Sequence, residues 1–282
     1  MYKALVNLNN AIRLDSTISE EYLLKGRIYW QSDNYSEADR AFDKVLLLDS
    51  ANTDAYYCRA RALYCLGKYK AVIRDMQKVQ VKNLPESAQG LYEYYWFIGA
   101  SYCRHQEYDS AIKYLSLSLK YNKNKKDPTT NYYLGDSYLN ISQYKEALKY
   151  ISQYNKLTPD DAEGYSDMGL IYLGLGNYDE ATEAFNKALK FDSTDFYVFL
   201  RYGKLLLARN IYKGALNAFD KSIKLMNDSS TIDKIGNPYY YRAQTYFKLN
   251  NNPSGCEDLN SAKRLGYDLQ KIEELAKQYC KN

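Results

Sequence analysis

The sequence predicts an all-α protein, a right-handed solenoid of stacked helical hairpins, and two observations carry this prediction. A pattern of small and aromatic residues recurs with a period of 34 residues along most of the 282-residue chain. Within each copy, the apolar residues stand three or four places apart, which is the spacing of one helix face. A fixed period of this length is typical of stacked repeats whose apolar faces cover one another.

The clearest copy of the pattern lies at 162–193. Its marker residues, at offsets of 3, 9, 12, 16 and 19 from Gly169, are Tyr172, Tyr178, Ala181, Phe185 and Ala188. Small residues suit places where two helices approach closely, and aromatic residues fill the space between helices. The turn between the two apolar stripes is indicated by Gly174, Gly176 and Asn177.

This order of small residue, Tyr, Ala and Phe resembles the tetratricopeptide repeat (TPR), a helix–turn–helix of 34 residues. The resemblance covers nearly the whole chain and implies a superhelix whose first helices line a concave inner face. We expect a single solenoid domain over 1–282, with an N-terminal half-repeat at 2–16 and a capping helix at 268–280. About seven full repeats are expected, at 19–52, 53–86, 92–125, 128–161, 162–195, 196–229 and 236–267.

Several elements depart from the pattern. The first helix has the spacing of a second helix, so either the chain is cut from a longer one or this end docks onto another molecule. In the second repeat, Ala60 replaces the glycine and Val72 the alanine, and the bulkier Val72 should push its two helices slightly apart. The seventh repeat departs at Asn252 and Gly255. In the capping helix, the residues expected to cover the last repeat are Leu269, Ile272, Leu275 and Ala276.

Composition excludes some classes of protein. The formal net charge of +4, from 38 basic and 34 acidic residues, is too small to indicate nucleic-acid binding by itself. Five cysteines without a CxxC motif predict neither a disulfide framework nor a zinc site. Free thiols favour a reducing compartment such as the cytoplasm. No membrane span or signal peptide is found, although a chain that begins in mid-repeat could lack an upstream targeting segment.

The sequence predicts a non-catalytic protein that needs no cofactor or metal. Its single histidine, His105, falls in an expected turn, where we expect it to be solvated. Asp160 and Asp161 precede a helix and are expected to cap it rather than to act as an acid/base pair. Neither of the glycine-rich phosphate-binding motifs is present.

The resemblance implies that a partner peptide or helix lies in the concave groove, on first-helix residues that are not used for packing. The N-terminal half of this groove is aromatic plus arginine, and Trp, Tyr and Arg are the residue types that dominate interface hot spots. We therefore expect a protein or peptide partner of acidic and apolar character, although the aromatics could instead only fill space between helices. The expected partner-binding residues are Arg27, Trp30, Tyr57, Arg61, Tyr64, Trp96, Arg104, Tyr132, Lys204, Tyr240 and Phe247.

Two alternatives remain open at this point. Related helical repeats bind RNA with one base per repeat, so an RNA-binding helical repeat is the first. The second is a self-assembling adaptor, a homo-oligomer formed through the uncapped N-terminal helix.

Overall fold

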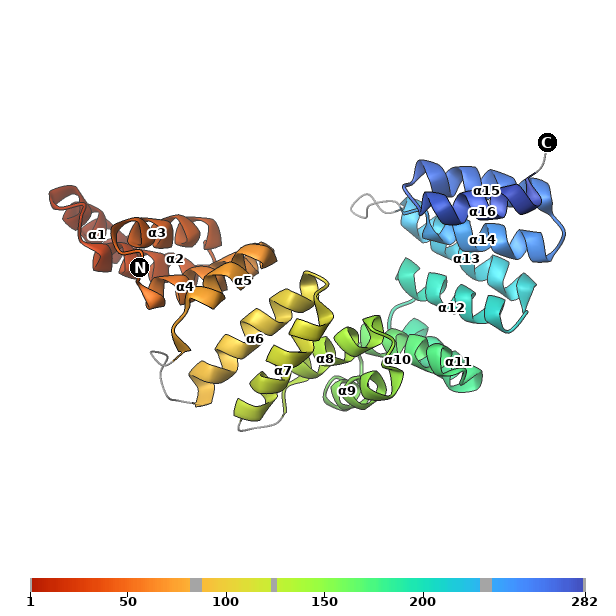
Figure 1. Ribbon diagram of the computed structural model, residues 1–282, viewed down its shortest axis with the longest axis horizontal. Helices are drawn as coiled ribbons and strands as arrows, with labels where there is room; N and C mark the ends of the chain where they lie inside the picture. Colours follow the sequence, from red (N-terminus) through yellow and green to blue (C-terminus); the bar gives the residue numbers. More distant parts are fainter. Residues whose placement is uncertain (1, 82–87, 123–125, 229–234, 281–282) are drawn as a thin grey trace. The chain divides into compact units, whose positions relative to one another are not determined.

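The computed structural model describes residues 2–81, 88–122, 126–228 and 235–280, and this part of the chain holds sixteen α-helices and no strand (Figure 1). The predicted all-α fold class is therefore confirmed. The helices form two compact bodies, 1–143 and 144–282, which we describe separately. The boundary falls inside the repeat expected at 128–161, and both the single domain and the number of repeats stay predictions.

The N-terminal body is a row of antiparallel hairpins in which α2 pairs with α3, α4 with α5, and α6 with α7. Its first helices, α2, α4, α6 and α8, also contact one another in succession, and we call the surface that they form the first-helix face. The helices are α1 (Tyr2–Leu14), α2 (Ser19–Gln31), α3 (Tyr35–Leu48), α4 (Thr53–Cys65), α5 (Tyr69–Lys78), α6 (Ala88–Arg104), α7 (Tyr108–Tyr121) and α8 (Pro128–Asn140).

The C-terminal body repeats this arrangement, with α10, α12 and α14 in contact as first helices and α16 packed on α15. Asp161 accepts a hydrogen bond from the Gly164 amide at 3.2 Å, so it caps α10 as the sequence predicts. The helices are α9 (Tyr144–Leu157), α10 (Ala162–Leu175), α11 (Tyr178–Phe191), α12 (Phe196–Ala208), α13 (Tyr212–Asp228), α14 (Asn237–Lys248), α15 (Asn252–Arg264) and α16 (Leu269–Tyr279).

The recurring glycine is a point of close approach between the two helices of a hairpin. A Cβ atom placed on Gly169 would lie 2.7 Å from a ring carbon of Phe185, which is fully buried. Gly26 with Phe42 and Gly203 with Phe219 repeat this contact at 2.5 Å. The packing roles predicted for Gly169 and Phe185 are thus confirmed, and the offset of 16 residues joins the two partners of one contact.

The turn inside each hairpin contains a residue with left-handed backbone, seven places after the small residue. Gly176, with φ of 79°, occupies this place after Gly169, within the turn that the sequence indicates. Glycine is strain-free in this conformation, and Asn and Asp tolerate it better than other residues. The equivalent left-handed residues are Asp33, Gly67, Gln106, Ser142, Asn210 and Asn250.

Two arginines of first helices join neighbouring second helices through aspartates. Arg59 makes a bidentate pair with the buried Asp75 at 2.6 and 2.8 Å, and its remaining nitrogen bonds Asp43. Arg242 repeats this with Asp258, at 2.7 Å for both bonds. Asp220, on the preceding hairpin, accepts from the remaining nitrogen of Arg242 at 2.6 Å. Each arginine thereby links its own hairpin to the preceding one, and the sequence analysis did not predict these ion pairs.

Some element boundaries differ from expectation. Helix α6 begins at Ala88, before the residue 92 expected as the start of its repeat. The expected repeat ends at 86, 125 and 229 lie outside the described residues. In the seventh repeat, a Cβ on Gly255 would overlap the ring of Phe247, which explains the departure from alanine at that place.

The C-terminal end corrects two expectations. Ile272 is buried and Leu275 and Ala276 pack beside it, as predicted, but Leu269 is 53% exposed and does not cover the last repeat. Cys256 and Cys280 form a disulfide, so the expectation of free thiols is wrong for these two cysteines. They are separated by 24 residues and meet only because α16 folds back onto α15, which spacing alone does not reveal.

Candidate protein-interaction surface

Arg61 is the centre of the first-helix face. Its guanidinium carbon lies 4.2 Å from the centroid of the Trp30 ring, on α2, and within 6 Å of the rings of Tyr57 and Phe97. A cation over an aromatic face is held by the quadrupole of the ring. Among the described residues, no carboxylate lies within ion-pair distance of Arg61, and its buried Nε finds no hydrogen-bond acceptor. Its positive charge is therefore held in place without being neutralised.

Arg104, at the end of α6, is held in a similar way. Its Nε donates a hydrogen bond of 3.3 Å to the Tyr133 hydroxyl, and its guanidinium lies 5.3 Å from the centroid of that ring. The Tyr133 hydroxyl is also 2.8 Å from the Tyr64 hydroxyl. Burial, followed by this hydrogen bond, raises the pKa of Tyr64, so its hydroxyl stays neutral at physiological pH. Arg104 has no carboxylate partner among the described residues either.

Trp96 contacts one ring of each arginine's surroundings, Phe97 beside Arg61 and Tyr133 beside Arg104. Its ring meets those of Phe97, Tyr64 and Tyr133 edge-on, with centroids 5.0, 5.3 and 6.0 Å apart. The indole is half-buried, and its Nε1 finds no acceptor in the described part of the chain. Three first helices, α4, α6 and α8, thus contribute to one aromatic cluster.

Two other predicted residues lie at the margin of this cluster. Arg27 pairs with Asp54 at 3.2 Å, and both side chains are about half exposed or more, so this pair is a weak surface interaction. The Tyr57 hydroxyl donates to Glu93 at 3.0 Å, and burial together with that carboxylate raises the pKa of Tyr57.

On α8, Tyr133 belongs to the aromatic cluster, whereas the sequence analysis predicted its neighbour Tyr132 as a binding residue. Tyr132 touches Tyr133 edge-on, with centroids 5.7 Å apart, but Tyr133 makes the contacts to Tyr64, Trp96 and Arg104. Phe97 was missed as well. The aromatic run in α6 was the available signal for Phe97, whereas adjacent tyrosines on α8 could be told apart only by the phase of the helix.

The predicted residues of the C-terminal body do not form a comparable surface. Tyr240 and Phe247 are buried in the core, where their rings stack on Tyr267 and Tyr279. Lys204 lies 4.9 Å from the centroid of the Tyr241 ring. Of the expected binding residues, the structure therefore gathers only those of the N-terminal body.

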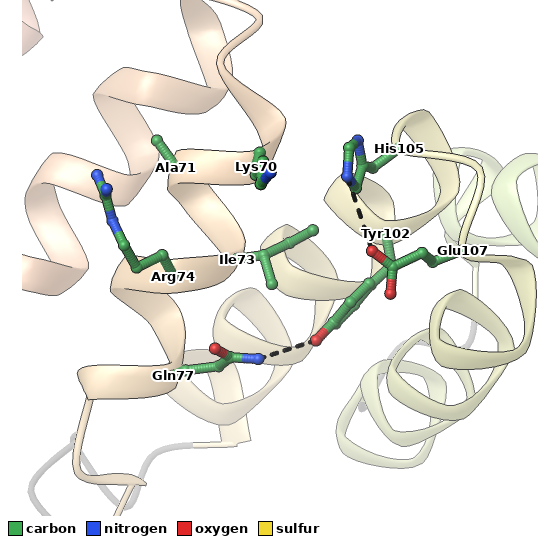
Figure 2. A pocket seen from close by; sticks show the side chains of 8 residues that line it. All are labelled: Lys70, Ala71, Ile73, Arg74, Gln77, Tyr102, His105 and Glu107. Carbon is green, nitrogen blue, oxygen red and sulfur yellow. Dashed lines mark hydrogen bonds and ion pairs between the residues drawn. The ribbon is translucent and has the colours of Figure 1, made fainter.

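A hollow of about 580 Å³ opens elsewhere in the N-terminal body, between α5 and the end of α6 (Figure 2). Figure 2 shows Ile73 pointing into it and the Gln77 amide donating to the Tyr102 hydroxyl, at 3.0 Å. His105 stands at its rim in an exposed turn, as predicted, 3.7 Å from Glu107. The hollow is lined by Lys70, Ala71, Ile73, Arg74, Gln77, Tyr102, His105 and Glu107.

Comparison with known proteins agrees with the repeat pattern. Models of the tetratricopeptide repeat match residues 22–52 and 162–195. No curated protein matches the sequence significantly. None of the described helices is long and apolar enough to cross a membrane.

Solved structures with the same fold cover most of the chain. A tetratricopeptide-repeat protein from Parabacteroides merdae is 16% identical with a TM-score of 0.68, over 93% of this chain and 99% of that one. YrrB, described as a TPR protein with an unusual peptide-binding site, is 20% identical with a TM-score of 0.57, over 72% and 97%. MamA is 24% identical with a TM-score of 0.52, over 62% and 92%. At these identities the likeness shows a shared fold.

Proposed function

Because the chain is a tetratricopeptide-repeat protein, we propose that it is a non-catalytic scaffold that binds a segment of another protein on its first-helix face. The segment is acidic and apolar, and it lies across Arg61, Trp96 and Arg104. YrrB, with the same fold and a peptide-binding site, offers a precedent for this use of the fold.

The observation that carries the proposal is that two arginines lie against aromatic rings without a carboxylate partner among the described residues. Arg61 and Arg104 are surrounded by aromatic rings and have no carboxylate partner among the described residues, whereas Arg59 and Arg242 have two aspartates each. A guanidinium can stack on rings and still offer its outer nitrogens to a carboxylate in bidentate geometry. A partner that supplies carboxylates would therefore gain charge-assisted hydrogen bonds, and its apolar side chains would bury against the exposed parts of the rings.

The test begins with capture of partners from the native lysate and mapping of the bound segment as labelled synthetic peptides. Fluorescence anisotropy then compares the wild type with Arg61→Gln and Arg104→Gln. Loss of an interface hot spot costs about 2 kcal/mol or more, which is a weakening of roughly 30-fold. Arg40→Gln is the matched control, because Arg40 is 76% exposed on α3 and its one ion pair among the described residues is with its neighbour Glu37.

Three outcomes would contradict the proposal. A peptide whose Glu residues are replaced by Gln should bind much more weakly, and equal binding would remove the role of the arginines. Tight binding of single-stranded RNA with steep salt dependence would favour the RNA-binding alternative. Self-association in sedimentation at rising concentration, with no captured partner, would favour the self-assembling adaptor.

A further inference from the structure

Helix α16 is fastened to the C-terminal body at its two ends. At its start, the chain turns at Gly266, which has φ of 74°, and the Tyr267 amide bonds the Ala262 carbonyl at 3.0 Å. Asp268 then caps the helix through the Lys271 amide at 3.2 Å. At its far end, Cys280 is joined to Cys256 of α15 by the disulfide. The turn can act as a hinge, and the disulfide is the covalent clasp opposite it.

Packing between these two ends is sparse. Ile272 is the single buried residue of the described helix, and Leu269 is more than half exposed. The remaining contacts are half-buried side chains, among which the Tyr279 ring stacks on Phe247 at 4.4 Å. A helix of eleven residues is too short to be stable by itself in water. Its docked state therefore depends strongly on the clasp.

We propose that the Cys256–Cys280 disulfide is a thiol–disulfide exchange site, and that its reduction by a dithiol releases α16 from the last repeat. Both sulfurs belong to half-buried residues, so a reductant can approach them. One thiolate of the dithiol attacks one sulfur, the S–S bond breaks, and the other cysteine leaves as a thiolate that takes up a proton. The second thiol of the reductant then displaces the first cysteine, so that the reductant is oxidised to its own disulfide and the protein gains two thiols.

The size of the effect follows from the loop that the bond closes. A bond across 24 residues restricts the open chain by an entropy that corresponds to a few hundredfold in the opening equilibrium. Reduction therefore makes opening of α16 more frequent by up to this factor, and native packing strain lowers it. Opening uncovers Phe247 and the apolar side of α14, which α16 otherwise covers.

Hydrogen exchange read by mass spectrometry tests the proposal on the full chain. Thiol titration of the denatured, air-oxidised protein should give three free thiols, and dithiothreitol should raise this to five. Dithiothreitol should also speed amide exchange in 269–279 by ten- to a few hundredfold and leave α10 to α13 unchanged. Cys280→Ser should exchange at the fast rate with and without the reductant. Cys65→Ser, which removes an exposed free thiol of the other body, should behave like the wild type.

Each contrary outcome overturns the proposal. Five free thiols before reduction would show that the disulfide does not form. Unchanged protection of 269–279 after reduction would show that packing alone holds α16. Faster exchange throughout the C-terminal body would make the disulfide a general structural bond and not a clasp on one helix.

Discussion

Replacement of the recurring glycine by alanine tests the packing of the hairpins. In Gly169→Ala, the new Cβ would lie 2.7–2.8 Å from three ring carbons of Phe185, whose side chain is fully buried. Overpacking of this kind costs about 1–3 kcal/mol, whereas the gain in helix propensity is about 1 kcal/mol. We expect a net effect between neutral and a destabilisation of about 2 kcal/mol, measured by urea unfolding followed by circular dichroism.

The chain itself supplies the control and the rescue. Gly214→Ala, on α13, meets its nearest neighbours at 3.3 Å and should be neutral or stabilising by up to about 1 kcal/mol. In the last repeat, Ala243 stands in the place of the glycine, and Leu259 stands 16 residues later in the place of the phenylalanine. The double variant Gly169→Ala/Phe185→Leu copies that pair and should recover about 1 kcal/mol relative to the sum of the single variants.

Two results would refute this reasoning. If Gly169→Ala is stabilised by about 1 kcal/mol, the full gain in helix propensity, the hairpin accepts the methyl group at no cost, and the glycine is not required by packing. If the double variant is simply additive, the alanine does not act through Phe185. Solenoid unfolding can proceed through intermediates, so hydrogen exchange of the amides in α10 and α11 provides a second measurement. It should rank the wild type, the single variants and the double variant in the same order of stability.

Two further substitutions probe buried charges. Arg59→Gln leaves the fully buried Asp75 without its bidentate partner and should destabilise the N-terminal body by about 3 kcal/mol or more in thermal unfolding. Arg74→Gln is the control, because Arg74 is 70% exposed and its replacement should be neutral. Equal effects of the two substitutions would refute the structural role of the Arg59–Asp75 pair. Burial alone would raise the pKa of Asp127, but hydrogen bonds, including one of 2.6 Å from Tyr92, lower it below its ordinary value. This stabilisation is present above pH about 4 and is lost as the pH falls through the lowered pKa, so Asp127→Asn should flatten the acid limb of the stability curve, and an unchanged limb would contradict the assignment.

The fold could be predicted from the sequence because the repeat encodes it many times. Gly169 and Phe185 show both the spacing and the size complementarity of one contact, and Gly203 with Phe219 repeats it. The left-handed turn residue was harder to find, because Gln106 occupies the same backbone conformation as Gly176. At such places the backbone is imposed by the packing of two helices, and the residue type carries little signal.

The surface was predicted less well, for physical reasons. A period of 34 residues places a side chain on the inner or outer side of the stack, but it does not say whether that side chain is buried by the next element. Tyr240 and Phe247 occupy first-helix positions like Tyr57 and Tyr64, yet rings that follow them in the sequence, Tyr267 among them, cover them. The disulfide depends on the same closing helix, which the sequence predicts without showing which side chains it covers or which cysteines it brings together.

Arg59 and Arg61 show how two places on one helix separate a structural role from a binding role. Successive residues on a helix differ by about 100°, so residues two apart point to different sides. Arg59 forms ion pairs with aspartates on α3 and α5, while Arg61, within the described part of the chain, contacts aromatic rings from α2, α4 and α6 and no carboxylate. A buried charge without a partner lowers the stability of the fold, and Arg61 is half-buried without a carboxylate partner among the described residues. An acidic partner would offset this cost on binding, which is why we place the contact at Arg61 and not at the equally conspicuous Arg59.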